Sequence, residues 1–268
     1  MNKLYRAAKG LFAAGVIAFV AVCILIWFVQ EDILFQGTAV PENTVYQNLP
    51  NIEDLWLHRP DGARLHIAKV TAANEVGTML YFHGNAAYNA YLDGMVNIYG
   101  GMGYTVVGLD YRGFGKSRGE RSEAAMLEDA LAFYDKIVPA GSPPPLIVGR
   151  SLGATFATYV ASKRPASRLV LYSPPGSILD TARRHYPWIP GFLLRYPLRT
   201  DEYMKNVAGP VLIFHGTDDK VVPFESGAIL KQYLKPSDRF VPIPGGTHRD
   251  IPWRNDVQRI LQKELAVP

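Results

Sequence analysis

The chain has 268 residues, of which 48% are hydrophobic, and a chain of this length can bury one large core. Its single cysteine, Cys23, excludes an intramolecular disulfide framework and a cysteine-based zinc cluster. The formal charge is +4, and three basic residues, Lys3, Arg6 and Lys9, precede the first acidic residue. The rest of the chain is nearly neutral, which argues against a nucleic-acid-binding face.

Residues 11–29 form an apolar segment without a charged side chain. As a helix this segment would span about 28 Å at about 1.5 Å per residue, close to the hydrocarbon thickness of a bilayer. Basic residues precede it and Gln30-Glu31-Asp32 follow it. The positive-inside rule therefore predicts a single-pass membrane protein with a cytoplasmic N-terminus and the remaining chain on the opposite, periplasmic or extracytoplasmic, side.

Two other interpretations of this segment are weaker. A cleaved signal peptide would have a shorter apolar core followed by small residues, whereas here the apolar run continues to Val29 without an A-x-A site. Lipid attachment at Cys23 would need a small residue before it, and Val22 stands there. We therefore predict an uncleaved signal anchor over residues 1–35.

A polar, proline-containing linker is predicted over residues 36–51 and a catalytic domain over residues 52–268. The domain begins with a hairpin, because residues 55–59 and 64–70 alternate apolar and polar side chains around the turn Pro60-Asp61-Gly62. The predicted hairpin leaves His58 and His66 at surface strand positions.

Strands and helices then alternate, which predicts an α/β fold with a mainly parallel central sheet flanked by helices on both faces. The predicted strands are Thr78–Phe82, Tyr104–Leu109, Leu146–Val148, Arg168–Tyr172, Val211–Phe214 and Arg239–Ile243. The predicted helices are Ala86–Gly100, Ser122–Val138, Ala154–Lys163, Glu225–Leu234 and Ile251–Leu265.

The most informative motif is Gly149-Arg150-Ser151-Leu152-Gly153, which lies between a predicted strand and a predicted helix. This G-x-S-x-G pattern is typical of a nucleophile elbow, a tight turn that exposes a serine at the carboxyl edge of a sheet. Serine needs such exposure and a base before it becomes a nucleophile. The glycines give room where the strand and helix backbones approach each other.

The base is predicted to be His248, which lies in the loop between the last strand and the last helix. A histidine on this loop can lie over the serine edge of the sheet. The other histidines have simpler interpretations: His83 and His215 precede glycines at strand ends, and His185 lies in an insertion.

The acid that orients the base should follow the strand ending at Phe214, where Asp218 and Asp219 are adjacent. Only one of the two side chains can point at one imidazole. We predict Asp219, with Asp218 as the alternative, and expect the other aspartate to accept main-chain hydrogen bonds in the turn.

The oxyanion hole is predicted to combine the main-chain N–H groups of Leu152 and Asn85. These residues, with Ser151, His248 and Asp219, would perform acyl transfer without a cofactor. Neither H-E-x-x-H nor an EF-hand loop is present, so no metal is predicted.

Several motifs occur in the order of a known family: His83-Gly84-Asn85, Asp110–Ser117, the serine motif, His215–Asp219 and His248. Together they resemble the α/β-hydrolase superfamily, and more narrowly the Bem46-like membrane-anchored serine hydrolases. The resemblance covers about residues 50–265. It implies a Ser151-Asp219-His248 triad in a membrane-tethered serine hydrolase of the esterase, lipase or thioesterase type, acting on a small or lipid-like acyl substrate.

Two alternatives to an esterase stay open: a serine peptidase or aminopeptidase with the same triad, and a tethered interaction module without turnover. A short insertion over about residues 174–207 is rich in aromatic, proline and arginine residues. It is either a wall of the acyl pocket facing head groups or the membrane surface, or a solvated helix over the sheet edge. The Asp110–Ser117 stretch is interpreted as structural, with Arg112 pairing to Asp110.

Overall fold

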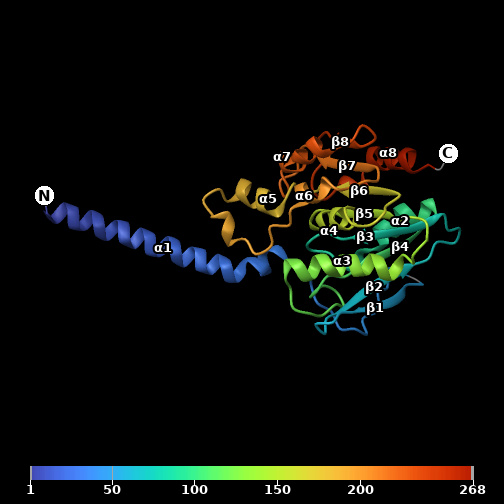
Figure 1. Ribbon diagram of the computed structural model, residues 1–268, viewed down its shortest axis with the longest axis horizontal. Helices are drawn as coiled ribbons and strands as arrows, with labels where there is room; N and C mark the ends of the chain where they lie inside the picture. The colour runs from blue at the N-terminus through green and yellow to red at the C-terminus, as the bar shows by residue number, and fades with distance from the viewer. Residues whose placement is uncertain (1, 50, 267–268) are drawn as a thin grey trace.

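The apolar N-terminal segment forms one continuous helix, α1 (Asn2–Leu34), in the computed structural model, which describes residues 2–49 and 51–266 (Figure 1). Figure 1 shows α1 projecting away from the rest of the chain. Its part from Leu4 to Leu34 is long and apolar enough to cross a bilayer. The helix predicted over residues 11–29 is confirmed, and it fits a single-pass membrane anchor.

In the described residues, eight strands form one sheet in the order β1-β2-β4-β3-β5-β6-β7-β8. The hairpin β1–β2 and the pair β2–β4 are antiparallel, and every pairing from β4 to β8 is parallel. The strands are β1 (Glu53–His58), β2 (Arg64–Val70), β3 (Gly77–Phe82), β4 (Tyr104–Leu109), β5 (Leu146–Arg150), β6 (Arg168–Tyr172), β7 (Val211–Gly216) and β8 (Arg239–Ile243). The predicted hairpin and mainly parallel sheet are confirmed.

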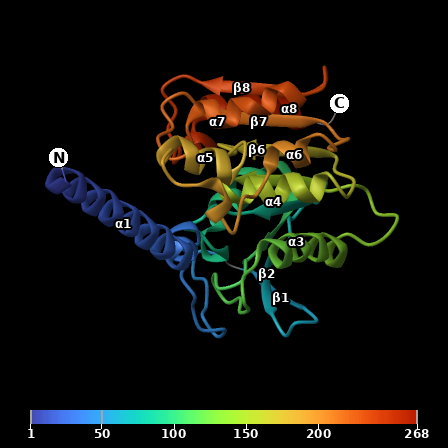
Figure 2. The same cartoon turned by 60° about the vertical axis from the view of Figure 1, so that its left-hand side comes forward.

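Helices cover both faces of this sheet (Figure 2). The helices that pack on its two faces include α2 (Asp93–Tyr99), α3 (Glu123–Ile137), α4 (Leu152–Ala161) and α8 (Asn255–Leu265). Side chains of a strand point alternately to opposite faces, so Leu80 and Phe82 join the core beneath α3 and α4, whereas Met79 and Tyr81 join the core beneath α2 and α8.

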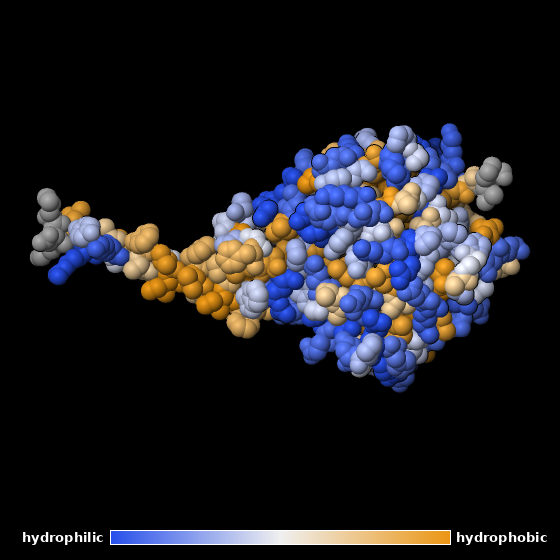
Figure 3. Space-filling view, viewed as in Figure 1, coloured by the Kyte–Doolittle hydropathy of each residue, from blue (hydrophilic) through white to orange (hydrophobic). Residues whose placement is uncertain are grey.

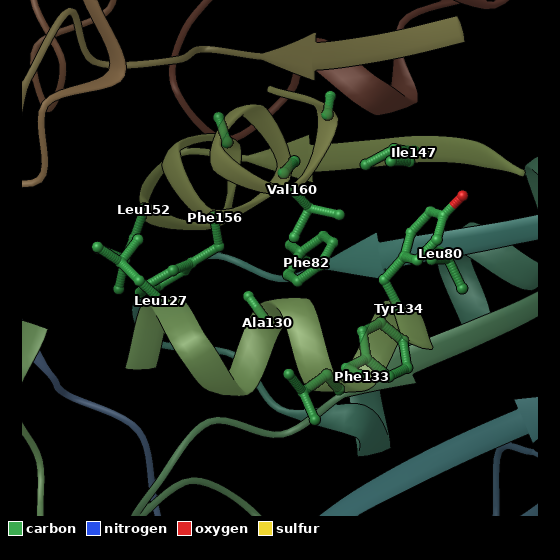
Figure 4. Close-up of a cluster of buried hydrophobic side chains, with 14 of the residues drawn as sticks. Leu80, Phe82, Leu127, Ala130, Phe133, Tyr134, Ile147, Leu152, Phe156 and Val160 are labelled. Atoms are coloured by element: carbon green, nitrogen blue, oxygen red, sulfur yellow. The ribbon is translucent and has the colours of Figure 1, made fainter. Parts of the chain in front are cut away.

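The core beneath α3 and α4 contains several fully buried aromatic rings (Figure 4). Phe82 of β3 meets Phe133 of α3 edge to face, with ring centroids 5.6 Å apart. Phe156 of α4 is also fully buried. Burying a side chain of this size stabilises the fold by about 1.5–3 kcal/mol, so these rings help to hold α3 and α4, the helix that follows the serine, against the sheet.

The helix predicted over residues 86–100 is shorter in the structure. The chain makes the turn η1 (Asn89–Tyr91) before α2 begins and the turn η2 (Gly100–Met102) after it ends. Asn89 is buried, its main-chain N–H donates to Asp110 Oδ1 at 2.7 Å, and its side chain donates to the Gly108 carbonyl at 3.1 Å. These bonds to the end of β4 and the residue after it prevent an earlier helix start.

The last two predicted helices are also divided. The segment over residues 225–234 consists of α7 (Phe224–Ala228) and η4 (Ile229–Tyr233), and that over 251–265 consists of η5 (Ile251–Trp253) and α8. Arg254 separates the second pair, because its backbone is extended, with φ −72° and ψ 134°, and interrupts the helical conformation between η5 and α8. The insertion after β6 contains α5 (Ile178–His185), η3 (Gly191–Leu193) and α6 (Thr200–Met204).

The segment after α1 lies against the domain. Phe35, Tyr46 and Leu49 are buried, and Ala39 forms a parallel bridge to Gly115. This segment therefore covers part of the surface of the hairpin and of the loop after β4.

Candidate active site

Ser151 lies at the turn between β5 and α4, as the G-x-S-x-G pattern predicts. Its backbone has a positive φ of 52° with ψ of −122°, a conformation that L-residues other than glycine rarely adopt. A Cβ at position 153 would lie 2.1 Å from the Phe82 carbonyl oxygen, so only glycine allows α4 to approach β3 this closely. The strained turn presents the Ser151 hydroxyl above the carboxyl edge of the sheet.

Three side chains from three separate loops meet at this edge. His248 Nε2 lies 2.9 Å from Ser151 Oγ, and His248 Nδ1 lies 2.8 Å from Asp219 Oδ2. Ser151 follows β5, Asp219 follows β7, and His248 follows β8. Because the carboxyl ends of parallel strands meet at one edge, residues 97 positions apart become hydrogen-bonding partners.

Asp219 is held as a carboxylate. Burial of its side chain disfavours the charged form, but hydrogen bonds from His248 and the Val222 main-chain N–H outweigh burial and lower the pKa of Asp219. Its Oδ1 accepts the N–H groups of Val221 and Val222 at 3.0 and 2.8 Å, which leaves Oδ2 directed at His248. An ionised, oriented carboxylate keeps the Nδ1–H tautomer of the imidazole and leaves Nε2 to accept a proton.

Asp218 points elsewhere. Its carboxylate is exposed, with a 3.4 Å contact from the Thr217 hydroxyl. We expected the aspartate that does not face the histidine, which is Asp218, to accept main-chain hydrogen bonds in the turn. This expectation is wrong, because Asp219 accepts those bonds and also faces His248. The buried His215, whose pKa is lowered by burial, lies behind the site, with Nε2 3.0 Å from the Val222 carbonyl.

Two main-chain N–H groups are available beside the serine. Within the described residues, the N–H groups of Asn85 and Leu152 donate no hydrogen bond to another protein atom. Leu152 is the first residue of α4, where N–H groups have no partner within the helix. The loop carrying Asn85 passes close to the serine, since a Cβ at position 84 would lie 3.6 Å from Ser151 Cβ. The two residues predicted for the oxyanion hole therefore come from loops that meet at Ser151.

The loop over residues 83–85 is held by two contacts that the motifs did not predict. The Tyr111 hydroxyl donates to the His83 carbonyl at 2.8 Å, and the Gln36 main-chain N–H donates to Asn85 Oδ1 at 2.7 Å. Tyr111 belongs to the Asp110–Ser117 motif, so that motif could have indicated a residue that supports this loop. Gln36 carries no local signal, because its contribution is a main-chain group.

Arg150, the variable residue before the serine, also contacts the site. Its guanidinium donates to the carbonyls of His248 and Arg249 at 3.4 and 3.3 Å. These long bonds link the serine turn to the loop that carries the histidine. The G-x-S-x-G pattern leaves this position unspecified, so the sequence alone gave no role for Arg150.

His66 is fully buried, and its predicted surface position is wrong. Its Nδ1 lies 2.9 Å from Asp110 Oδ2 and its Nε2 lies 2.7 Å from Asp54 Oδ1. The ring of Tyr46 packs edge-on against the imidazole at 5.8 Å. The alternating pattern of β2 indicated an open face, but the segment after α1 covers that face.

Arg112 does not pair with Asp110 as predicted. Its guanidinium donates to Asp129 of α3 at 2.6 and 3.1 Å, and it also bonds Asp61 in the hairpin turn. Arg112 and Asp129 are both buried, whereas Asp110 is occupied by His66 and Asn89. The pair joins α3 to the loop after β4.

Within residues 2–49 and 51–266, the structure contains no group of three or more His, Cys, Asp or Glu side chains suited to hold a metal ion. A serine within hydrogen-bond reach of an imidazole, itself oriented by a carboxylate, is the arrangement that activates a hydroxyl for attack on a carbonyl. The fold and the arrangement of the site define a serine hydrolase of the α/β class.

Comparison with known proteins gives the same class. A hydrolase family model described as serine aminopeptidase, S33, matches residues 73–200. An uncharacterized protein of Mycobacterium tuberculosis is 31% identical over 252 residues, which cover 91% of this chain and 87% of that protein. The lysophosphatidylserine lipase ABHD12 of Gallus gallus is 34% identical over 276 residues, covering 89% of this chain and 68% of the lipase. The chain therefore belongs to the α/β-hydrolase superfamily, as its motifs predicted.

Solved structures share the fold at low sequence identity. Est1E from Butyrivibrio proteoclasticus, with ferulic acid bound, has a TM-score of 0.66 and 20% identity, covering 80% of this chain and 100% of Est1E. The Pyrococcus furiosus esterase Pf2001 has a TM-score of 0.67 and 18% identity, covering 85% of this chain and 95% of the esterase. Both similarities concern the fold of the domain.

Proposed function

We propose that the protein is a membrane-anchored serine hydrolase of the esterase or lipase type, which cleaves the carboxylic ester or thioester bond of a lipid-like acyl substrate. The observation that carries the proposal is the pair of hydrogen bonds from His248 to Ser151, at 2.9 Å, and to Asp219, at 2.8 Å. The class of reaction also accords with the lipase activity named for the relative in Gallus gallus.

The proposed reaction begins when Ser151 Oγ attacks the substrate carbonyl while His248 Nε2 takes the hydroxyl proton. The main-chain N–H groups of Asn85 and Leu152 stabilise the negative charge on the carbonyl oxygen. His248 then gives its proton to the leaving alcohol or thiol, which departs and leaves an acyl group on Ser151. Water, deprotonated by His248, releases the acid and restores the serine.

A lipid-like substrate is supported by the position of the site relative to α1. Gln36, two residues beyond the end of α1, donates its main-chain N–H to the side chain of Asn85. The loop containing Asn85 passes beside Ser151. If α1 spans the bilayer, the reacting serine lies close to the membrane surface, where lipid esters are concentrated.

We further propose that the N-terminus is cytoplasmic and that the catalytic domain lies on the opposite side of the membrane. Lys3, Arg6 and Lys9 precede the apolar span, and Glu31 and Asp32 follow it. Short basic flanks remain on the cytoplasmic side of a membrane. The proposed organisation is therefore an anchor over residues 1–35, a connecting segment over 36–51 and a catalytic domain over 52–268.

A peptidase is the second candidate, and the description of the matching family model as a serine aminopeptidase favours it. The same three residues would then attack an amide. Purified full-length protein in detergent, assayed on p-nitrophenyl acyl esters of increasing chain length and on aminoacyl p-nitroanilides, separates the two candidates. We expect turnover of the esters.

The control for this assay is Ser151→Ala, which should lose about 10⁴-fold or more in kcat while keeping the thermal midpoint of a folded protein. Near-normal activity in a folded Ser151→Ala variant would contradict the proposed mechanism for either substrate class. Turnover of the anilides alone would replace the esterase with the peptidase.

A further inference from the structure

The insertion after α5 contains an apolar loop, here called the cap loop, which consists of residues 186–194. Its sequence, Tyr-Pro-Trp-Ile-Pro-Gly-Phe-Leu-Leu, contains no charged side chain. Its three aromatic residues are all exposed: Tyr186 at 52%, Trp188 at 54% and Phe192 at 83%. Clustered exposed aromatic rings on a soluble surface are unfavourable, so such a patch marks an interaction site.

The cap loop is fixed beside the end of α1. The Gln30 side chain donates to the Leu193 carbonyl at 3.1 Å and accepts the Arg195 main-chain N–H at 2.8 Å. The Arg195 guanidinium also forms a 2.7 Å ion pair with Glu31. Gln30 follows the last residue of the apolar span, so these bonds place Leu193 at the depth where α1 leaves the hydrocarbon.

An apolar groove of about 340 Å³ lies between α1 and the cap loop. Its α1 side runs from Phe19 to Phe28, a rise of about 14 Å along a helix. Its other side is formed by Pro190, Phe192 and Leu193. Figure 3 shows the apolar surface of α1 continuing onto the adjoining edge of the domain.

The lining of this groove belongs to the apolar span of α1 and to the cap loop, and it contains none of the residues Ser151, Asp219 and His248. The groove is therefore separate from the proposed catalytic centre. A groove that begins at the end of a membrane span and continues along it opens into hydrocarbon rather than into water.

We propose that the cap loop is a second membrane-embedded element, which inserts into the leaflet on the domain side, and that acyl chains of bilayer lipids occupy the groove. Moving the exposed aromatic surface of this loop from water into hydrocarbon is favourable, because apolar area is removed from water. Aromatic rings of this type are typical of membrane interfaces. The proposal uses the membrane span of α1 from the proposed function, but it does not depend on the catalytic residues.

Basic side chains on either side of the cap loop fit this orientation. Arg183, Arg184 and His185 precede it, and Arg195 follows it, all at exposed positions, although Arg184 pairs with Asp180 and Arg195 with Glu31. At the depth where the apolar span of α1 ends, these groups meet lipid phosphates, while the alkyl stems of the arginines remain over apolar surface. The apolar loop between two basic flanks therefore has the charge distribution of a segment that dips into a leaflet.

The test measures probe depth in the full-length protein reconstituted into phosphatidylcholine vesicles. Cys23→Ala removes the only thiol, and single cysteines are then introduced by Phe192→Cys or Trp188→Cys in the cap loop and labelled with an environment-sensitive fluorophore. Ile17→Cys, exposed at 69% within the α1 span, serves as the membrane control, and Val76→Cys, exposed at 59% before β3, serves as the aqueous control.

We expect spin-labelled phosphatidylcholine to remove most of the emission from positions 17, 188 and 192, and aqueous iodide to quench position 76 alone. Iodide quenching at positions 188 and 192 with lipid quenching at 17 would overturn the proposal while leaving the membrane span intact. Iodide quenching at 17 as well would show that α1 does not span. Protection of 188 and 192 from both quenchers would overturn the proposal by showing that protein, such as a second copy, covers the cap loop.

Discussion

The main-chain N–H of Gln36 and the side-chain oxygen of Asn85 are 2.7 Å apart, although 49 positions separate them in the sequence. Gln36 belongs to the segment that leaves α1, and Asn85 belongs to the loop that passes beside Ser151. The bond therefore connects the start of the segment that follows the proposed anchor to the loop of the proposed oxyanion hole. Asn85 has two parts in this arrangement, since its side chain accepts the bond from Gln36, while its main-chain N–H, which has no partner in the described part of the chain, is the proposed oxyanion donor.

The first prediction concerns this bond. Asn85→Ala keeps the main-chain donor but removes the acceptor for Gln36, so the loop loses one hydrogen bond worth about 0.5–1.5 kcal/mol. We expect kcat on a short soluble p-nitrophenyl ester to fall by about 2- to 10-fold, with a smaller change in KM. Asn85→Asp keeps an acceptor oxygen and should retain more of kcat. Equal kcat in the wild type and Asn85→Ala would show that the bond does not position the loop.

The second prediction separates the two adjacent aspartates. Asp219→Asn should lower kcat by about 10⁴-fold, because an amide neither stabilises the imidazolium nor maintains the Nδ1–H tautomer. Asp218→Asn is the matched control, since Asp218 is exposed and contacts Thr217 rather than His248. Steady-state ester hydrolysis by both variants gives the comparison. A larger loss in Asp218→Asn would reassign the orienting acid.

The third prediction concerns the buried ion pair of Arg112 and Asp129. Arg112→Ala leaves the buried Asp129 carboxylate with Arg59, 2.8 Å away, as its remaining cationic partner, and breaking a buried pair costs up to about 3–5 kcal/mol. We expect a clearly lower thermal midpoint in detergent. Arg164→Ala, which breaks the half-exposed pair with Asp135, should cost less than about 1 kcal/mol. Equal shifts in the two variants would contradict the assigned difference.

The fourth prediction is a loss of stability in mild acid. Burial lowers the pKa of His83 and of His215 below the ordinary value of 6.5, so the folded protein keeps both rings neutral while the unfolded chain binds protons. Stability contributed by these neutral rings is complete above pH 6.5 and decreases as the pH falls below it. Thermal midpoints measured from neutral to mildly acidic pH should decline.

His215→Asn should make this decline shallower, because the variant has one fewer buried group that gains a proton on unfolding. His58→Asn, at an exposed strand position, is the control and should follow the wild type. The same slope in His215→Asn and the wild type would exclude His215 as a source of the pH dependence.

The sequence predicted most of the sheet because strand signals are local. Alternation and apolar runs located β4, β6 and β8 at their observed bounds. Helix starts were less well predicted where a side chain bonds to a distant element. Asn89, for example, has an ordinary helical context, but its bonds to Asp110 and Gly108 replace the first helical turn.

The sequence predicted the part of the candidate site that consists of the three proposed catalytic side chains. Ser151, Asp219 and His248 were selected from their order along the chain, and they lie within hydrogen-bond distance in the structure. Contacts that depend on packing between distant segments could not be predicted from the sequence. The packing of Tyr46 on His66 depends on how the segment after α1 lies against the hairpin. The partners of Arg112 depend on the position of α3 relative to the loop after β4.

The positive φ of Ser151 has a consequence for how the protein has been shaped by selection. Held at φ 52°, this residue occupies backbone geometry that costs of order 1–3 kcal/mol for a residue with a Cβ. A glycine there would relax the turn but would remove the proposed nucleophile. At this position the residue that would give the most stable fold differs from the residue that the proposed activity needs. Close packing of the strand and helix on either side offsets the cost of the strained backbone.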